Sequence, residues 1–362
     1  MRNALEFTFH KSIESNVAIY IQKGSIHDLT VVLSDIQLDK VFVVCDENVE
    51  TLYGKSIMVS LQKQFESHLL VHKADEHDKN LEALTNLSNA FFKAGGTSKS
   101  CICAVGGGIT GNIAGLLSTV AYRGIMLVHI PTTLLAQLDS AADVKQSVNA
   151  PGVKNAIGAY KAPSKVVVDP EVLNSLSDRE IRSGLGEAVK HGFAQDLNLV
   201  KAIVDVDRHD LVALEKIIRR TIELKIDHWN HTPTSWNDPQ KVERLTHLGH
   251  TTGKILEMIE VDHLTHGEAI AHGMVIEAEV SNNLGYLSED DVEYMRSTLQ
   301  KIGLLYPLTK NYTASAVLSG LYSLGKRPLF AVLKELGNPE TLSLEVPQGV
   351  LAKAIEKYPF AA

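Results

Sequence analysis

The sequence predicts an α/β N-terminal domain over residues 1–174, followed by a mainly α-helical domain over residues 175–362. Two patterns predict this fold class. Short apolar runs alternate with helical spacing up to about residue 170, which is typical of a parallel sheet joined by crossover helices. Helical spacing dominates beyond that point, and a chain of 362 residues suits about two domains.

The first half contains five runs with the apolar, β-rich composition of buried strands. They are residues 41–45, 68–72, 100–105, 126–130 and 166–169. Helices are expected between them at 50–66, 81–94 and 112–122. Glycines at 95 and 96 end the second of these helices.

The second half is expected to hold long helices and few strands. The helical patterns cover residues 178–193, 198–228, 241–260, 266–284 and 289–303. The polar stretch 229–240 is predicted to be a loop, because Pro233 and Pro239 interrupt the helical pattern.

Composition excludes several classes of protein. The net charge of −8 argues against a nucleic-acid-binding protein, although a few local cations would still accommodate an anionic substrate. Three cysteines without a CxxC pair indicate no disulfide framework and a reducing compartment. No apolar run approaches the ~20 residues of a membrane helix, and the N-terminus lacks a signal-peptide core. A cytoplasmic protein without membrane or nucleic-acid partners is expected.

The glycines after the third strand have the spacing of a nucleotide-binding turn. Gly106, Gly108 and Gly111 satisfy G-x-G-x-x-G between a strand and a helix. Such a turn lets the backbone approach a pyrophosphate at the N-terminus of the helix. The acid expected about 20 residues later is missing, since Asp139 is the nearest downstream acid. A tight structural turn without a ligand is the alternative.

Three side chains in the second half form a candidate metal site. Glu187, His250 and His266 combine one carboxylate with two imidazoles, which suits a catalytic divalent metal such as zinc. Lys190 shares a helical face with Glu187, and Lys254 shares one with His250. Spacing alone also allows His191 and His263 as ligands, and assigns three histidines to the solvated surface: His228, His231 and His272.

The chain therefore predicts a dinucleotide-binding α/β domain joined to a metal-binding helical domain. Its candidate anion-binding cations are Arg123, Lys145, Lys154, Lys190, Lys225, Lys326 and Arg327. Each cation alone is ordinarily a solvated surface charge. Their position near motif glycines and asparagines indicates phosphate binding.

The order of these motifs resembles the sugar-phosphate cyclases, of which 3-dehydroquinate synthase is the type member. The similarity covers about residues 40 to 335. The residues that carry it are Gly106, Gly107, Gly108, Gly111, Asn112, Gly115, Arg123, Pro131, Thr132, Thr133, Asp139, Lys145, Asn149, Lys154, Asn155, Gly158, Glu187, Lys190, His250 and His266.

The resemblance implies a dehydroquinate synthase-like fold and a role for each position. It implies that Glu187, His250 and His266 hold Zn²⁺ or Co²⁺. It implies that NAD is bound by Gly106, Gly107, Gly108, Asn112, Thr132, Thr133 and Lys154, with Asp46, Glu76 and Lys79 at the adenosine end.

The resemblance also implies how a phosphorylated sugar is bound. Asp139 and Lys190 are expected at the reacting hydroxyls, and Lys154 near the nicotinamide or the reacting hydroxyl. Together with Lys254 these residues are expected to be catalytic. The phosphate and the rest of the substrate are expected to contact Lys145, Asn155, Lys225, His247, Lys254, Lys326 and Arg327. Arg123 is expected to reach across from a neighbouring subunit, which would make the protein a homodimer.

The reaction implied is the formation of a carbocycle without net redox change. The metal acidifies a substrate hydroxyl, NAD removes hydride from that carbon, and the resulting ketone acidifies the adjacent C–H so that phosphate is eliminated. Return of the hydride precedes an intramolecular aldol addition, and the protein contributes positioning and electrostatics.

Four positions depart from 3-dehydroquinate synthases. Lys254 replaces their second histidine, Glu243 replaces an arginine, His247 replaces an asparagine and Asn112 replaces an aspartate. The arginine pairs with the substrate carboxylate, and a glutamate there would repel it. These departures weigh against dehydroquinate synthesis.

Other residues resemble 2-deoxy-scyllo-inosose synthases, which cyclise glucose 6-phosphate. They are residues 108–112, 145–149 and 326–327. Lys254 departs from that group too: it either adds a full charge to the phosphate site or removes a proton-transfer group. Sedoheptulose 7-phosphate cyclases, a polyol dehydrogenase of the glycerol dehydrogenase group and a non-catalytic relative stay open as alternatives.

Overall fold

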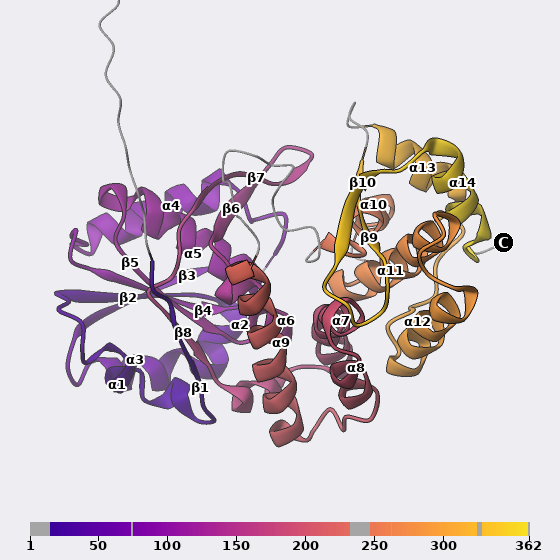
Figure 1. The fold of residues 1–362 in the computed structure, drawn as a ribbon. Coiled ribbons are helices and arrows are strands. Elements are labelled where there is room, and N and C mark those ends of the chain that lie inside the picture. Colours follow the sequence, from indigo (N-terminus) through magenta and orange to yellow (C-terminus); the bar gives the residue numbers. More distant parts are fainter. Residues whose placement is uncertain (1–14, 74, 232–246, 262, 324–327, 361–362) are drawn as a thin grey trace, which may run out of the picture.

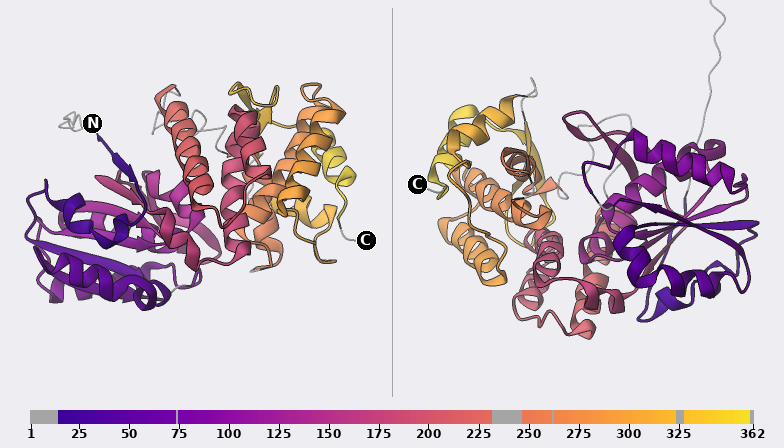
Figure 2. Two further views of the ribbon diagram at one scale, coloured as in Figure 1. Left: turned by 90° about the horizontal axis from the view of Figure 1, so that it is seen from below. Right: turned by 180° about the vertical axis from the view of Figure 1, so that it is seen from behind.

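The computed structural model describes residues 15–73, 75–231, 247–261, 263–323 and 328–360, without the side chains of residues 230 and 231. An α/β domain and a helical domain lie side by side (Figure 1). Two further views show the long helices α7 (Asp178–Gln195) and α9 (Leu211–His231) between the sheet and the other helices (Figure 2).

A six-stranded parallel sheet forms the first domain, in the order β1-β8-β5-β4-β2-β3. Its strands are β1 (Ala18–Ile21), β2 (Lys40–Asp46), β3 (Glu66–His72), β4 (Cys101–Gly106), β5 (Met126–Pro131) and β8 (Lys165–Val168). The five expected strands are present. The sequence analysis missed β1, a four-residue edge strand, although its sequence Ala-Ile-Tyr-Ile is apolar.

Helices cover both faces of this sheet, as a parallel sheet requires. Alternate residues of β2 enter different cores. Val41 and Val43 pack with α1 (Leu29–Leu33) and α3 (Lys55–Leu61), whereas Phe42 and Val44 pack with α4 (Leu81–Lys93) and α5 (Gly108–Val120). The helix predicted at 50–66 begins at Glu47 as α2 (Glu47–Val49), passes through the π-helical turn η2 (Glu50–Gly54) and ends with α3 at Leu61.

An antiparallel hairpin, β6 (Lys145–Ala150) and β7 (Val153–Tyr160), lies against α5. The sequence analysis predicted no strand here, because both segments are polar and most of β7 is exposed. Lys145 begins the hairpin at its base, paired with Tyr160. The hairpin therefore carries several expected site residues on regular strands rather than in loops.

The helical domain contains α7 to α14 and a small two-stranded sheet. Besides α7 and α9 its elements are α8 (Leu197–Val204), α10 (His250–Ile259), α11 (His266–Asn283), α12 (Glu289–Ile302), α13 (Ala314–Tyr322), β9 (Leu329–Leu333), β10 (Thr341–Glu345) and α14 (Gln348–Lys357). The prediction of one helix over 198–228 is wrong. Helix α8 ends at Val204. The Asp210 carboxylate then accepts hydrogen bonds from the N–H groups of Val212 and Ala213 and caps the start of α9.

The prediction of a loop at 229–240 is wrong for its first three residues, because α9 continues to His231; residues 232–240 lie outside the described ranges. Short 3₁₀ turns within the described residues include η1 (Ser25–His27), η3 (Ala121–Arg123), η4 (Ser140–Ala142) and η5 (Pro170–Ser175). The expected domain boundary at 174/175 falls within η5.

Helix α11 is the centre of the helical domain, with nearly every residue from Gly267 to Ser281 buried. Glycines let α7 and α10 approach it closely. A Cβ at Gly267 would lie 1.9 Å from the Ser183 carbonyl oxygen, and one at Gly273 would lie 2.0 Å from the Gly249 carbonyl oxygen. These contacts hold together the three helices that carry the expected metal ligands.

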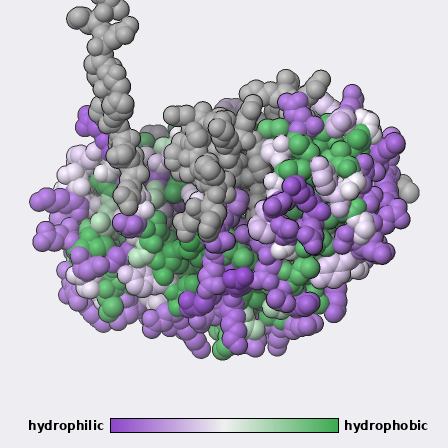
Figure 3. All heavy atoms as spheres, viewed as in Figure 1, coloured by the Kyte–Doolittle hydropathy of each residue, from purple (hydrophilic) through white to green (hydrophobic). Residues whose placement is uncertain are grey.

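The surface shown in Figure 3 mixes hydrophilic and hydrophobic residues over both domains. Among the described residues, no helix combines the length and the apolar composition needed to span a bilayer.

Candidate metal and cofactor site

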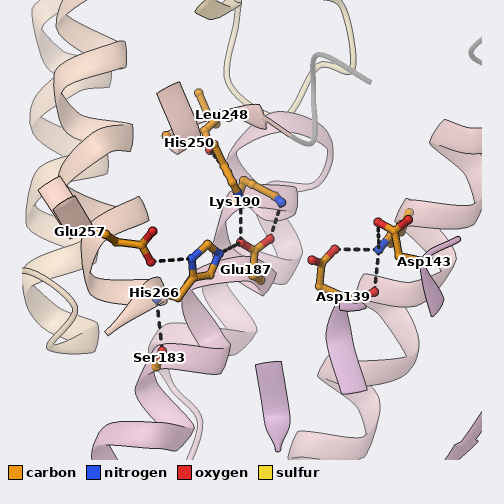
Figure 4. A network of polar contacts seen from close by, with 12 residues as sticks. Asp139, Asp143, Ser183, Glu187, Lys190, Leu248, His250, Glu257 and His266 are labelled. Carbon is orange, nitrogen blue, oxygen red and sulfur yellow. Dashed lines mark hydrogen bonds and ion pairs between the residues drawn. The ribbon is translucent and has the colours of Figure 1, made fainter. Parts of the chain in front are cut away.

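Helices α7, α10 and α11 bring Glu187, His250 and His266 together (Figure 4). The two histidines are the first residues of their helices. A Thr265–Glu268 capping box begins α11, and Gly249, with φ of 77°, begins α10. The ligand atoms of the three residues lie within 4.8 Å of one another.

The distances suit a shared cation. Glu187 Oε1 lies 3.1 Å from His266 Nε2 and 3.4 Å from His250 Nε2. One carboxylate oxygen and two imidazole nitrogens form a donor set that fits a catalytic zinc or a similar divalent metal. The alternatives His191 and His263 do not belong to the group of three whose ligand atoms lie together; His191 Nδ1 bonds to Gln195, and His263 Nε2 bonds to the Pro307 carbonyl.

The charge states of Glu187 and His266 also indicate that this cluster favours a cation. Burial opposes the charged form of Glu187, but Lys190, His250 and His266 outweigh it and hold its pKa well below the usual range. Burial also opposes a charge on His266, yet its hydrogen bonds to Glu187 and Glu257 raise its pKa to about 10. The buried carboxylate is thus compensated by positive charge, which is the contribution that a bound metal makes.

Two histidines expected at the surface are partly or wholly enclosed. His272 is buried in α11, where Nδ1 bonds with the Tyr358 hydroxyl and Nε2 with the Tyr306 carbonyl. His228 is half-buried, and burial lowers its pKa. The surface prediction is therefore wrong for His272, because α11 is surrounded by other helices; the side chain of His231 lies outside the described residues.

Around the ligands, Lys190 is buried and bonds to the second oxygen of Glu187. Glu257 of α10 accepts a hydrogen bond from His266 Nδ1, at 3.0 Å from its Oε1. The sequence analysis missed Glu257. Its signal was helical spacing, since residues 250, 254 and 257 share one face of α10.

An ion pair connects the sheet domain to α9. Lys225 Nζ donates to the carbonyl oxygen and to Oδ1 of Asp139, both at 2.7 Å, and lies 3.7 Å from Asp143 Oδ2. Burial opposes the charge on Asp139, but Lys225 outweighs it and keeps the pKa of Asp139 low. Asp143, also missed, lies 3.7 Å from Lys145 Nζ. Asp139 is therefore ionised beside the metal ligands.

Lys254 lies one turn after His250 with an exposed side chain. Desolvation by the surrounding protein atoms lowers its pKa, and the charges of Lys145 and Lys190 act in the same direction, whereas Glu257 raises it. Lysines from both domains thus face one region. The His247 ring lies 6.0 Å from the His250 ring, in a perpendicular arrangement. Lys326 and Arg327 lie outside the described residues.

The glycine turn has the geometry of a nucleotide-binding turn. Gly107 is the N-cap of α5, and no side chain among the described residues caps that helix. A small pocket lies beside the turn. It is lined by Ala104, Gly106, Gly107, Gly111, His129, Pro131, Ala136, Ser140 and Ala141. The exposed N–H groups at this helix start fit a pyrophosphate.

His129, which the sequence analysis missed, lines the same pocket. Its Nε2 is buried without a hydrogen-bond partner among the described residues. Burial lowers the pKa of His129 to about 4, so its imidazole is neutral near pH 7. A buried polar atom without a partner is uncommon and marks a position where a ligand or an ordered water would bond.

Several expected cofactor residues bond to the protein itself. Asp46 caps α2 through Asn48 and Val49 N–H, and Thr133 caps α6 (Leu134–Leu138) through Ala136 N–H. Asn112 donates to the Gly108 carbonyl and accepts from Ser147 N–H, which ties α5 to β6. Thr132 is buried, and its N–H bonds to the Gly106 carbonyl. These side chains shape the turn.

The expected adenosine-end residues form a separate network. Buried Lys79 donates to the Asn155 amide oxygen, and Glu76 Oε1 accepts from Asn149 Nδ2 at 2.8 Å. Asn155, with φ of 55°, lies toward the hairpin tip, away from Lys145 at its base. The structure therefore groups Asn155 with Lys79 rather than with the expected phosphate lysine. Lys154 is exposed on β7. Burial raises the pKa of Glu257, but the hydrogen bond and charge of His266, with smaller contributions from Lys154 and Lys254, outweigh burial and lower it.

Arg123 lies on the exposed turn η3, away from these networks. Its φ of 65° follows a φ of 50° at Tyr122. Tyr122 is exposed and contacts the ring of Phe92. The turn presents an arginine beside two exposed aromatic rings.

Comparison with known proteins assigns the chain to a family. The 3-dehydroquinate synthase N-terminal family model matches residues 69–183, and the C-terminal one matches residues 184–325. A 2-deoxy-scyllo-inosose synthase of Streptomyces paromomycinus is 36% identical over 75% of this chain and 71% of its own. A 3-dehydroquinate synthase of Prochlorococcus marinus is 32% identical over 80% of this chain and 82% of its own.

Solved structures agree with this assignment. A 2-deoxy-scyllo-inosose synthase, complexed with carbaglucose-6-phosphate, NAD+ and Co2+, superposes with a TM-score of 0.83 at 27% identity, covering 94% of this chain and 96% of that one. A 2-epi-5-epi-valiolone synthase from Streptomyces hygroscopicus, with NAD+ and Zn2+ bound, shares the fold with a TM-score of 0.86 at 23% identity, covering 98% and 99%. The predicted fold is confirmed, and the chain belongs to the 3-dehydroquinate synthase family of carbocycle-forming sugar-phosphate cyclases.

Proposed function

We propose that this protein is an NAD- and divalent-metal-dependent cyclase that converts glucose 6-phosphate into a carbocycle, as 2-deoxy-scyllo-inosose synthases do. The observation that carries the proposal is the Glu187, His250 and His266 cluster, with lysines from both domains around it. The complex of a related synthase with carbaglucose-6-phosphate supports this substrate class.

The described residues fit both cofactors. Glu187, His250 and His266 would hold Zn²⁺ or Co²⁺, and the turn at Gly106–Gly108 would hold the NAD pyrophosphate. Bound together, the two groups would supply reversible hydride acceptance and Lewis acidity. The position of Asp46, Thr133 and Asn112 supports an indirect role for these side chains, through the shape of the turn.

The charged residues around the metal ligands would orient the sugar. Asp139 stays ionised beside Lys225, so its free oxygen accepts hydrogen bonds from substrate hydroxyls. Lys190 donates from the other side and holds Glu187 in place. Fixing both partners before the reaction lowers the entropy cost of reaching the transition state.

The phosphate would lie between the two domains. Lys145 from β6 and Lys254 from α10 provide two positive charges, and His247 adjoins His250 at the same end of the site. Lys254 would supply the full charge that a histidine provides only when protonated. Lys326, Arg327 and Asn155 remain proposed phosphate contacts on the sequence alone.

One sequence position favours a substrate without a carboxylate. Glu243, outside the described residues, stands where dehydroquinate synthases have the arginine for the substrate carboxylate. A negative charge at that place raises the cost of binding a second one. Dehydroquinate synthesis is therefore the weaker proposal.

We also propose a domain boundary at 174/175 and a homodimer in which Arg123 serves the partner's site. The exposed Phe92 and Tyr122 rings beside Arg123 support an interface there. Light scattering of the wild-type protein and of Arg123→Ala tests the assembly, and a monomeric wild type would rule out the shared site.

The decisive experiment measures inorganic phosphate released from glucose 6-phosphate with NAD and Zn²⁺ or Co²⁺, while absorbance at 340 nm is recorded. Phosphate release without net NADH is expected. Net NADH without phosphate would instead indicate a polyol dehydrogenase. Release only from seven-carbon substrates would indicate a dehydroquinate synthase or a sedoheptulose 7-phosphate cyclase, and cofactor binding without turnover a non-catalytic relative.

A further inference from the structure

Glu257 is a largely enclosed carboxylate that touches the candidate metal ligand His266 rather than the metal position itself. We propose that Glu257 is a positioning residue that fixes the ring of His266, so that its Nε2 faces the metal. The proposal rests on the proposed function to the extent that the site binds a divalent metal. The positioning role goes beyond the proposed function, because it assigns the orientation of one candidate ligand to a residue of α10.

The contacts place His266 between two carboxylates. Its Nδ1 lies 3.0 Å from Glu257 Oε1, and its Nε2 lies 3.1 Å from Glu187 Oε1 (Figure 4). Glu257 and Glu187 come from α10 and α7, while His266 begins α11. The ring is therefore held from both ends by different helices and cannot rotate without losing one contact.

This arrangement decides which nitrogen is available to a metal. Both carboxylates only accept hydrogen bonds when ionised, but a metal shared by Glu187 and Nε2 would take the lone pair of Nε2. The proton of a neutral His266 would then lie on Nδ1, facing Glu257. Carboxylates behind metal-binding histidines act in this way in many metal sites. The side chain of Glu257 is 13% exposed, so water competes little for this hydrogen bond.

His250 provides an internal comparison. Its Nδ1 lies 3.2 Å from the Leu248 carbonyl oxygen, which is also an acceptor only. Both histidines thus present Nε2 to Glu187, one held by a neutral carbonyl and the other by a charged carboxylate. The charged partner makes the stronger hydrogen bond and raises the basicity of His266 as a ligand.

One face of α10 therefore carries three parts of the site. His250 is a ligand, Lys254 follows four residues later and Glu257 follows seven residues later. A movement of this helix would change one ligand directly and the other through Glu257. The two histidines are coupled through a single rigid element.

The test is the affinity of purified protein for Zn²⁺ in the absence of NAD and sugar, measured by competition with a chromophoric chelator. Glu257→Gln is expected to weaken binding 10- to 100-fold, because a glutamine can donate to Nδ1 and favour the wrong tautomer. The d–d absorption of the Co²⁺-loaded variant is expected to change, since the ligand field senses the orientation of His266. NAD affinity is expected to stay the same.

Glu260→Gln is the matched control. Glu260 follows Glu257 by three residues and accepts from Thr309 Oγ1 at 2.6 Å, away from His266. The Glu260→Gln variant should therefore bind Zn²⁺ with the same affinity as the wild type. Glu257→Asp, a smaller change, serves if Glu257→Gln does not fold, and is expected to keep the tautomer and bind metal more tightly than the glutamine variant.

The outcomes separate this inference from the proposed function. Equal Zn²⁺ affinity and equal Co²⁺ spectra for Glu257→Gln, Glu260→Gln and the wild type would overturn the positioning role. A wild type that binds metal with the expected Glu257 effect but releases no phosphate would leave the role standing and overturn the cyclase. A wild type that binds no divalent metal would overturn both.

Discussion

The two halves of the candidate site use their polar side chains in opposite ways. Where α7, α10 and α11 meet, three side chains direct donor atoms into one space within 4.8 Å. Around the glycine turn, hydrogen bonds to backbone groups of the protein are formed by the side chains of Asp46, Thr133 and Asn112. We therefore propose that the metal is bound through side chains, and the nucleotide through backbone groups whose arrangement the side chains fix.

The difference follows from the ligands. A catalytic zinc needs a few strong donors at short range, and these come from side chains such as carboxylates and imidazoles. A pyrophosphate is satisfied by the N–H groups of a helix start. Substitutions should therefore abolish function on the metal side and mainly change stability on the nucleotide side.

The largest effect is expected from Glu187→Gln. Removing the buried carboxylate should lower the rate of phosphate release on the order of 10³-fold or more, because a catalytic metal contributes several kcal/mol. Assays of phosphate release and of Zn²⁺ affinity measure this loss. The exposed Asp178→Asn on the same helix is the control, and equal activity in the two variants would contradict the metal assignment.

His129→Leu tests the buried imidazole of the nucleotide side. The pKa of His129 is about 4 in the folded protein, below the ordinary 6.5, so the unfolded chain binds more protons between these values. Stability should fall as the pH drops from 6.5 to 4, and this loss should be smaller by roughly 2–3 kcal/mol in the variant.

Urea unfolding of the cofactor-free protein at pH 6.5 and 4.5 measures that difference. The exposed His209→Gln should behave like the wild type. If His129→Leu loses as much stability as the wild type over this interval, the histidine is not held neutral by burial.

Lys254→Met should act on substrate binding. Losing one charged contact to phosphate costs about 2 kcal/mol, so KM for glucose 6-phosphate should rise about 30-fold while kcat changes less. Steady-state kinetics measure both. Lys254→His should recover part of the loss below pH 6.5, and Lys301→Met, an exposed lysine of α12, should have no effect. A fall in kcat alone would instead indicate proton transfer by Lys254.

The smallest effect is expected from Thr133→Ala. Loss of this helix cap should cost about 1 kcal/mol of stability and change NAD affinity less than about threefold. Thr313→Ala removes the same kind of cap from α13 and should cost a similar amount. A tenfold loss of NAD affinity without a loss of stability would mean that Thr133 contacts the cofactor directly.

Strong local patterns were predictable in this chain, and weak ones were not. The strands around Val43 and Val105 were predicted correctly, because a strand buried on both faces needs a continuous apolar run. Most helices were predicted from the periodic spacing of their apolar residues. The hairpin β6–β7 was missed because both strands are polar and most of β7 is exposed. The short edge strand β1 was missed too, and its pairing partner β8 lies far along the chain, at Lys165–Val168. The break between α8 and α9 was not predicted. The aspartates between residues 205 and 210 were compatible with a continuous helix, and only the structure shows that Asp210 caps the start of α9.

The sequence by itself determined the class of chemistry: the order of glycine turn, Glu187, His250 and His266 specifies the ligand types, because the chemistry of a donor atom is a property of its residue. Only the tertiary structure decided which groups meet. It buried His272, turned Asn155 to Lys79 and set Glu257 behind His266. Distances between residues far apart in the chain depend on how helices pack, and contacts such as Gly267 against Ser183 define that packing.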